Sequence, residues 1–207
     1  MSLLLERNIC ISNRKGGIIC AIEGVLEDAT NDLSTECRSY VFTAKEYLNF
    51  LIEAIHRYDD CLEKSVMVHA DCKKLLKLEG VGTMNAINLY LALGCAELGV
   101  FSKGKDALAC IGLTAIQPSS GGGVKFGSIG KHCKNSTLRS QLVCGAMAAV
   151  HQVVIQEAKT KKDVWLKGLV ERRGKKCAAV ALANKTVRMA YTMLTQGTEY
   201  KAELLAA

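Results

Sequence analysis

The sequence predicts an all-α protein, and three observations carry this prediction. The chain has one proline in 207 residues, only 5% aromatic residues, and long stretches in which apolar residues recur at intervals of three and four. β-Sandwiches and barrels need many turns and aromatic-rich strands, so this composition argues against them. Hydrophobic residues make up 49% of the chain, which is too many for a disordered protein and enough for a sizeable core.

Charge divides the chain into two expected domains, a helical linker over residues 1–76 and a helical domain over residues 77–207. Residues 1–77 hold 10 Lys and Arg against 12 Asp and Glu, whereas the remainder holds 17 against 8. A basic half of this kind is typical of a protein that meets a polyanion, most commonly nucleic acid. Ordinary lysine-rich helix surfaces are the alternative.

The linker is expected to form a coiled-coil arm or an antiparallel helical hairpin. A helix is predicted from about Thr43 to Lys77, because apolar residues there form a seam with spacing of three and four: Leu48, Leu51, Ile55, Tyr58, Leu62 and Leu76. A lone helix with such a seam leaves an apolar stripe exposed. We therefore expect a homo-oligomer that forms through the coiled coil.

A helix-hairpin-helix is predicted where the linker meets the domain. An apolar helix end is followed by Gly80 and Gly82, and a second helix starts near Thr83. Glycines permit a positive φ and let backbone N–H groups approach a phosphate, and the N-terminal end of the helix dipole favours the same anion. Gly80 and Gly82 are therefore candidate contacts to a DNA backbone. An ordinary two-helix turn is the alternative.

One long non-helical stretch, residues 114–128, is predicted to follow a short helix from Gly104 to Ile111. It contains the only proline and four glycines, three of which directly follow Ser119 and Ser120. A loop of this kind in a helical chain is where chemistry would be placed, since a serine among glycines can approach a DNA strand unhindered. A hydroxyl still needs a base or metal to activate it. A surface connector is the alternative.

Three further helices complete the predicted domain. The first runs from about Ser136 to Lys159, the second carries Trp165 as an expected core anchor and ends at Gly174, and the third runs from Lys175 to Leu194. The turn at Gly174 gathers four cations that could clamp a phosphate, with a solvated turn as the alternative: Arg172, Arg173, Lys175 and Lys176.

The ten cysteines form neither a disulfide framework nor a zinc site. No two lie at C-x-x-C spacing and none has zinc-ligand spacing with a histidine, so we expect small core or boundary residues in a reducing compartment. No apolar stretch reaches the ~18 residues of a membrane span. These features predict a cytoplasmic, nucleoid-associated protein with no membrane partner.

The C-terminal 130 residues resemble the C-terminal transposase domain of insertion-sequence recombinases that carry an N-terminal RuvC-like DEDD domain. Bridge-RNA-guided recombinases and Piv-type DNA invertases belong to that group. The coiled-coil segment resembles the linker of the same family. Five ordered blocks carry the resemblance: Glu79-Gly80-Val81-Gly82, Ile111-Gly112-Leu113-Thr114, Ser119-Ser120-Gly121-Gly122, Lys131 to Arg139, and Arg172 to Ala183.

The resemblance implies that Ser120, with Ser119 as the fallback, attacks a DNA phosphodiester and forms a covalent phosphoserine link. It implies that Mg²⁺ acts only with a RuvC-like partner domain, so no cofactor is expected in this chain itself. DNA contacts are also assigned to Lys125, Lys131 and Arg139, which lie in and after the loop. A guide RNA is a further partner that the resemblance allows.

We therefore interpret the chain as a truncated or split transposase that binds DNA, supplies the serine, and is inactive alone because a RuvC-like domain is missing. The sequence departs from the family pattern at Cys133, where glycine is usual, and at Glu79 and Ala115, where prolines are usual. Two alternatives stay open. One is a non-enzymatic helix-hairpin-helix DNA-binding module, and the other is a helical adaptor that dimerises through the seam.

Overall fold

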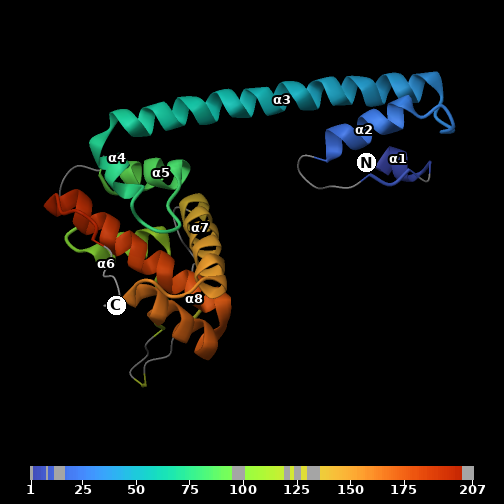
Figure 1. The fold of residues 1–207 in the computed structure, drawn as a ribbon. Coiled ribbons are helices and arrows are strands. Elements are labelled where there is room, and N and C mark those ends of the chain that lie inside the picture. Colours follow the sequence, from blue (N-terminus) through green and yellow to red (C-terminus); the bar gives the residue numbers. More distant parts are fainter. Residues whose placement is uncertain are drawn as a thin grey trace. The chain divides into compact units, whose positions relative to one another are not determined.

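The computed structural model describes residues 2–7, 9–11, 17–94, 101–118, 122–123, 127–129 and 136–201, which are mostly helical (Figure 1). Within these residues, extended pairing is confined to an isolated antiparallel bridge between Ala115 and Ile129. The all-α prediction is confirmed. In chain order the helices are α1 (Ser2–Leu5), α2 (Ile18–Glu27), α3 (Thr35–Val68), α4 (Ala70–Leu75), α5 (Thr83–Leu93), α6 (Gly104–Ile111), α7 (Ser136–Ile155) and α8 (Lys161–Gln196).

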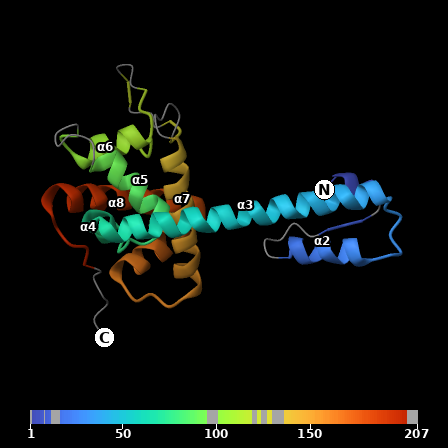
Figure 2. The ribbon, with the colours of Figure 1, turned by 90° about the horizontal axis from the view of Figure 1, so that it is seen from above.

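The chain divides into two compact units, Met1–Cys61 and Leu62–Ala207. In the first unit, α2 lies beside the first turns of α3 in both ribbon views (Figures 1 and 2). The guanidinium of Arg38 fixes the connection between them, because it donates to the carbonyl oxygens of Leu26 at 2.9 Å and Asp28 at 2.8 Å. A small apolar core holds the pair together: Leu4, Leu33 and Val41, with Ile22, Val25 and Leu26 at its edge.

The helix predicted from Thr43 to Lys77 differs from α3 at both ends. α3 begins earlier, at Thr35, and also ends earlier, at Val68. At the C-terminal end of α3, His69 takes an extended conformation with φ −89° and ψ 106°. Its imidazole stacks on Tyr90 of α5, with ring centroids 5.9 Å apart. The chain changes direction here because α4 buries Cys72 and Leu75 in the core of the second unit.

In the second unit α7 and α8 pack against each other at the centre of the core, as Figure 2 shows. The second arm of α8 is rich in small buried residues, which let the two helices approach closely. By length and hydropathy alone, α7 is one helix that could cross a membrane, although no such stretch was expected from the sequence. In the structure its core-facing side is buried at intervals of four: Leu138, Leu142, Ala146 and Val150.

The long helix α8 consists of two arms that meet at Gly174, as the sequence predicts. Gly174 has φ 80° and ψ 165°, a conformation that breaks the helix and favours glycine. The first arm begins at a capping box, in which the Thr160 hydroxyl accepts from the Asp163 N–H at 3.1 Å. The second arm ends at Gly197, which has φ 64°.

The described cysteines follow the core prediction only in part. Cys72 is buried in the second unit, and Cys37 and Cys110 are half-buried, as expected for core and boundary positions. Cys144 and Cys177, by contrast, lie on exposed faces of α7 and α8. Their small, apolar neighbours in sequence face the core instead, because each helix buries only one side.

Candidate nucleic-acid interface

The predicted hairpin connects α4 to α5, and its two glycines have different roles. Gly80 has φ +75°, whereas Gly82 has φ −92° and is the N-cap of α5, so only Gly80 needs the freedom of glycine. A Cβ atom on Gly80 would lie 2.7 Å from the carbonyl oxygen of Gly145 in α7, but one on Gly82 would meet nothing within 4 Å. Gly80 is thus explained by packing, and Gly82 is the glycine with open surroundings.

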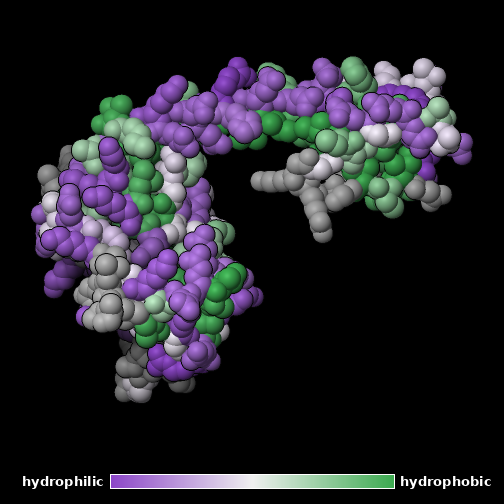
Figure 3. All heavy atoms as spheres, in the orientation of Figure 1, coloured by the Kyte–Doolittle hydropathy of each residue, from purple (hydrophilic) through white to green (hydrophobic). Residues whose placement is uncertain are grey.

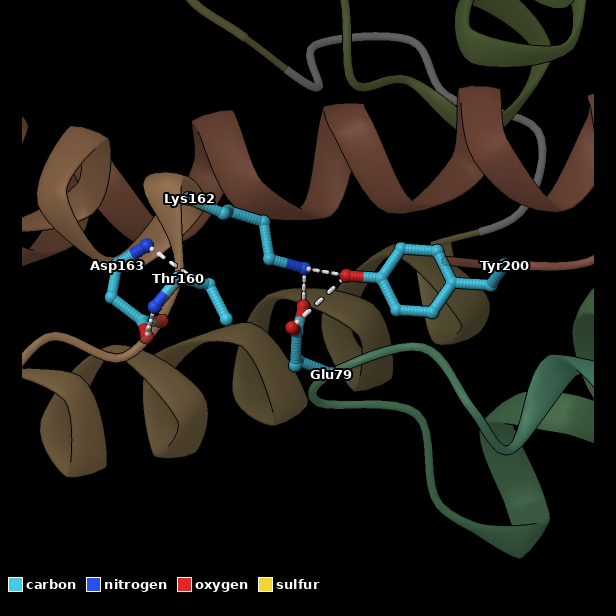
Figure 4. A network of polar contacts seen from close by, with 5 residues as sticks. All are labelled: Glu79, Thr160, Lys162, Asp163 and Tyr200. Carbon is cyan, nitrogen blue, oxygen red and sulfur yellow. Dashed lines mark hydrogen bonds and ion pairs between the residues drawn. The ribbon is translucent and has the colours of Figure 1, made fainter. Parts of the chain in front are cut away.

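A polar network fixes the hairpin to both ends of α8 (Figure 4). The ammonium of Lys162 pairs with the carboxylate of Glu79 and donates to the hydroxyl of Tyr200 at 2.7 Å. The Tyr200 hydroxyl in turn donates to Glu79 Oε1 at 3.1 Å. Three segments that are distant in sequence therefore meet at one set of contacts: the hairpin, the start of α8 and the segment after α8.

Lys162 lies in an environment that disfavours its charge. Burial, together with the positive charge of Lys185, lowers the pKa of Lys162 to about 8. The negative charge of Asp163 acts in the opposite direction, and the ion pair with Glu79 also favours the charged form. The ammonium form therefore predominates at neutral pH, and it can serve as the donor in the network.

A groove of about 970 Å³ runs along the second arm of α8, between the loop base at Leu113 and Ile129 and the C-terminal segment. Among the described residues one carboxylate lines it, that of Glu199, which pairs with Lys77 at 3.6 Å. Apolar side chains of α8 form much of the floor. Four cations also line the groove and make it electropositive: Lys176, Lys185, Arg188 and Lys201.

Trp165 lines this groove and is 36% exposed, so the prediction of a core anchor is wrong. The ammonium of Lys185 lies 5.2 Å from the centroid of its ring. The neighbouring Leu166 takes the core position instead. Sequence reasoning also missed Lys185 and Arg188, although their spacing of three on a helix places them on one face.

The ends of the non-helical stretch come together beside the groove. The Gly127 N–H donates to the Ile116 carbonyl at 2.7 Å. On one side of this base, Asn184 of α8 donates to the Leu113 carbonyl at 3.2 Å, and on the other Arg139 of α7 donates to the Ile129 carbonyl at 3.3 Å. The described part of the predicted loop is therefore non-helical, as expected, and it is fixed at the rim of the groove.

Four of the predicted site residues, Ser119, Ser120, Lys125 and Lys131, lie outside the described residues. Arg139 is half-buried and holds the loop base, so part of its hydrogen-bonding capacity is used within the protein. The four cations predicted at the Gly174 turn are exposed, and of these Lys176 lines the groove: Arg172, Arg173, Lys175 and Lys176. Within the described part of the chain, no cluster of His, Cys, Asp or Glu could hold a metal ion.

Part of this chain matches a known protein family. Residues 72–162 match the model of the transposase IS116/IS110/IS902 family. This match covers the hairpin, the loop base and α7, and it ends at the start of α8. The groove along the second arm of α8 therefore lies outside the matched residues.

Several transposases are similar to the chain over most of its length. It is 35% identical over 149 residues to the "Transposase for insertion sequence element IS1111A" of Coxiella burnetii, a match that covers 72% of this chain and 40% of the relative. It is 30% identical over 196 residues to the "Probable family 20 transposase" of Pseudomonas aeruginosa, which covers 92% and 56%. The chain thus spans about half the length of these curated relatives. The comparisons support a transposase domain of the IS116/IS110/IS902 kind in this chain.

Proposed function

We propose that this chain is the DNA-binding, serine-bearing part of an insertion-sequence transposase. One observation carries the proposal most directly. The base of the loop that bears Ser119 and Ser120 is fixed beside a groove lined by four cations. A DNA strand on those cations would run past the loop, because phosphate contacts position a strand on a protein surface.

In the proposed reaction the Ser120 hydroxyl attacks a phosphorus atom of the DNA backbone. A serine–phosphate bond forms as the bond from phosphorus to one deoxyribose oxygen breaks, and that oxygen leaves as a hydroxyl. Attack by a DNA hydroxyl on the phosphoserine reverses these steps and rejoins a strand. We assign activation of the serine to Mg²⁺ held by a RuvC-like domain, since a hydroxyl alone is a weak nucleophile.

DNA binding is tested by titrating a labelled duplex with the 207-residue chain across a salt series. We expect the affinity to fall as salt rises, because cations of the protein displace condensed counterions. Replacement of Arg172 and Arg173 by Ala should weaken binding and reduce the slope of log K against log salt. Absence of binding at low salt would overturn the proposal.

The serine assignment is tested in a reaction that adds a RuvC-like partner domain and Mg²⁺. Ser120→Ala should leave DNA binding intact and abolish both covalent protein–DNA adducts and strand joining. Ser119→Ala is the matched control and should retain both. If Ser119→Ala alone abolished them, Ser119 would be the nucleophile. If both serines proved dispensable, the non-enzymatic DNA-binding module would replace the enzymatic proposal.

Self-association through α3 is the second part of the proposal. Side chains of the predicted seam stay exposed on α3, including Leu51 at 38% and Ile55 at 59%. Figure 3 shows hydrophobic side chains along one side of this helix, beside long hydrophilic stretches. A transposase acts on two DNA ends, so pairing of two α3 helices would bring two serine-bearing units to one reaction.

A further inference from the structure

The groove along α8 combines features that duplex DNA would not use together. Two aromatic side chains line the described part of the groove: Trp165, which is 36% exposed, and Tyr200, whose hydroxyl contacts Lys162 and Glu79. Apolar groups form the floor, among them Val180, Met189 and Met193. A duplex presents phosphates and sugars on its outer surface and keeps its bases stacked inside. Its outer surface therefore has no group that would stack on an aromatic ring or pack on an apolar floor.

Cations reach the groove from α8 and from the segment after it. Lys185 and Arg188 are exposed on one face of α8, and Lys201 approaches from the segment after it. The carboxylate of Glu199 forms an ion pair with Lys77 at 3.6 Å. This pairing reduces the electrostatic repulsion between Glu199 and a bound phosphate. A positive groove with an aromatic side chain is the usual combination in proteins that bind single strands, where bases stack on the ring.

We propose that this groove binds an unpaired stretch of DNA strand, with a base against the Trp165 indole and the phosphates along Lys185, Arg188 and Lys201. This inference rests on the proposed function and specifies the form of DNA that the site takes. The volume of about 970 Å³ is at the upper end of the ~300–1,000 Å³ range of small-molecule sites, so a nucleotide can enter.

The groove lies beside the base of the serine-bearing loop, where an unpaired strand would be needed for strand exchange. Leu113 and Ile129, which line the groove, also belong to the base of the serine-bearing loop. A strand separated from its complement and held at Trp165 would therefore remain beside that loop. Strand exchange requires such a separated segment, because a rejoined strand must pair with a new complement.

Trp165 is the only tryptophan in the chain, so its fluorescence reports on this groove directly. The full chain is titrated with single-stranded oligothymidine and with a duplex of equal length, under selective excitation of the indole. We expect strong quenching with the single strand, since a stacked base deactivates the excited ring, and weak quenching with the duplex. A single strand that binds without changing the fluorescence would overturn the inference.

Variants then separate stacking from charge, with a labelled single strand and anisotropy as the readout. Trp165→Ala should weaken binding roughly 5- to 150-fold, and Trp165→Phe less, because a smaller ring still stacks. Lys185→Gln with Arg188→Gln should reduce the salt slope by about 1.4, the value for two phosphate contacts on a single strand. Lys105→Gln, at an exposed position of α6 that does not line the groove, is a single-charge control and should change the affinity little.

The outcomes distinguish failure of this inference from failure of the proposed function. Duplex binding with no single-strand binding, or with Trp165 variants that bind the single strand as the natural chain does, would reject the groove assignment and leave the proposed function standing. No binding of either DNA would reject both. An RNA strand of the same sequence that bound more tightly than the DNA would overturn the assignment to DNA.

Discussion

Gly80 and Gly145 meet backbone to backbone, where the hairpin before α5 rests on α7. A Cβ atom on Gly80 would lie 2.7 Å from the Gly145 carbonyl oxygen, and one on Gly145 would overlap the carbonyl oxygen of Gly80. That Gly80 oxygen accepts a hydrogen bond from the Asn85 side chain at 3.1 Å. The position of the hairpin therefore requires glycine at both positions, because neither site has room for a side chain.

Gly145→Ala should destabilise the second unit by about 1–3 kcal/mol, because the new methyl group must displace the hairpin backbone. Gly80→Ala should cost at least as much, since the same overlap is joined by a positive φ that costs roughly 1–2 kcal/mol for a residue with a side chain. Urea unfolding followed by the fluorescence of Trp165 measures both, because that residue belongs to the same unit.

Gly168→Ala provides the matched control for these substitutions. A Cβ atom there meets nothing within 4 Å, and the residue lies inside the first arm of α8. We expect a stabilisation of about 0.5–1 kcal/mol, the usual gain from alanine over glycine in a helix. Equal stabilities for Gly145→Ala and Gly168→Ala would show that the hairpin does not rest on α7 in this way.

Glu79→Gln should destabilise the second unit by about 1–2 kcal/mol. The side chain of Lys162 is only 9% exposed, so loss of the carboxylate leaves a largely buried ammonium without its ion pair. Tyr200→Phe should have a smaller effect in the same direction, since it removes one neutral hydroxyl from the network. Thermal unfolding in low and moderate salt measures these changes.

Lys77→Gln is the control for the loss of an ion pair in the same region. Lys77 and Glu199 are 50% and 63% exposed, and such pairs contribute less than about 1 kcal/mol. This variant should unfold close to the natural chain, and its small effect should vanish as salt rises. A loss for Glu79→Gln no greater than that for Lys77→Gln would contradict the structural role of the network.

Arg139 and Arg173 should respond differently to substitution, although both were assigned to DNA contact from the sequence. Arg139 donates to the Ile129 carbonyl at 3.3 Å and is half-buried, whereas Arg173 is exposed. Arg139→Gln should therefore lower thermal stability, and Arg173→Gln should lower duplex affinity with the melting temperature unchanged. If Arg139→Gln were as stable as the natural chain but bound the duplex more weakly, Arg139 would be a direct DNA contact, as the sequence predicts.

Local signals in the sequence predicted much of the second unit. The helix from Gly104 to Ile111 matches α6, since it starts and ends at glycines, and the break at Gly174 is a backbone requirement that only glycine meets easily. The helix predicted from Ser136 to Lys159 begins where α7 begins, but α7 ends earlier, at Ile155. These features depend on neighbouring residues, and periodicity and turn chemistry report them directly.

Tertiary contacts account for what the sequence did not predict. α3 ends at Val68, before the predicted Lys77, and the His69 imidazole that follows stacks on Tyr90, twenty-one positions along the chain. Trp165 was assigned to the core by its apolar character, yet Leu166 next to it faces inward and Trp165 faces the groove. Lys201 lines the groove from the segment after α8, where the neighbouring Tyr200 hydroxyl contacts Glu79 and Lys162.

Ile55→Glu should weaken self-association of the chain at least tenfold. Ile55 is 59% exposed on α3, so the substitution removes little packing within one chain but places a charge in the seam that two helices would share. Sedimentation equilibrium or light scattering across a concentration series measures the effect. His56→Glu, at an exposed position next to it and off the seam, is the charge-matched control and should associate as the natural chain does. If both variants associated equally, the oligomer contact would lie elsewhere. If the natural chain stayed monomeric at every concentration, the coiled-coil part of the proposal would be rejected, because an apolar seam in water is stabilised by pairing.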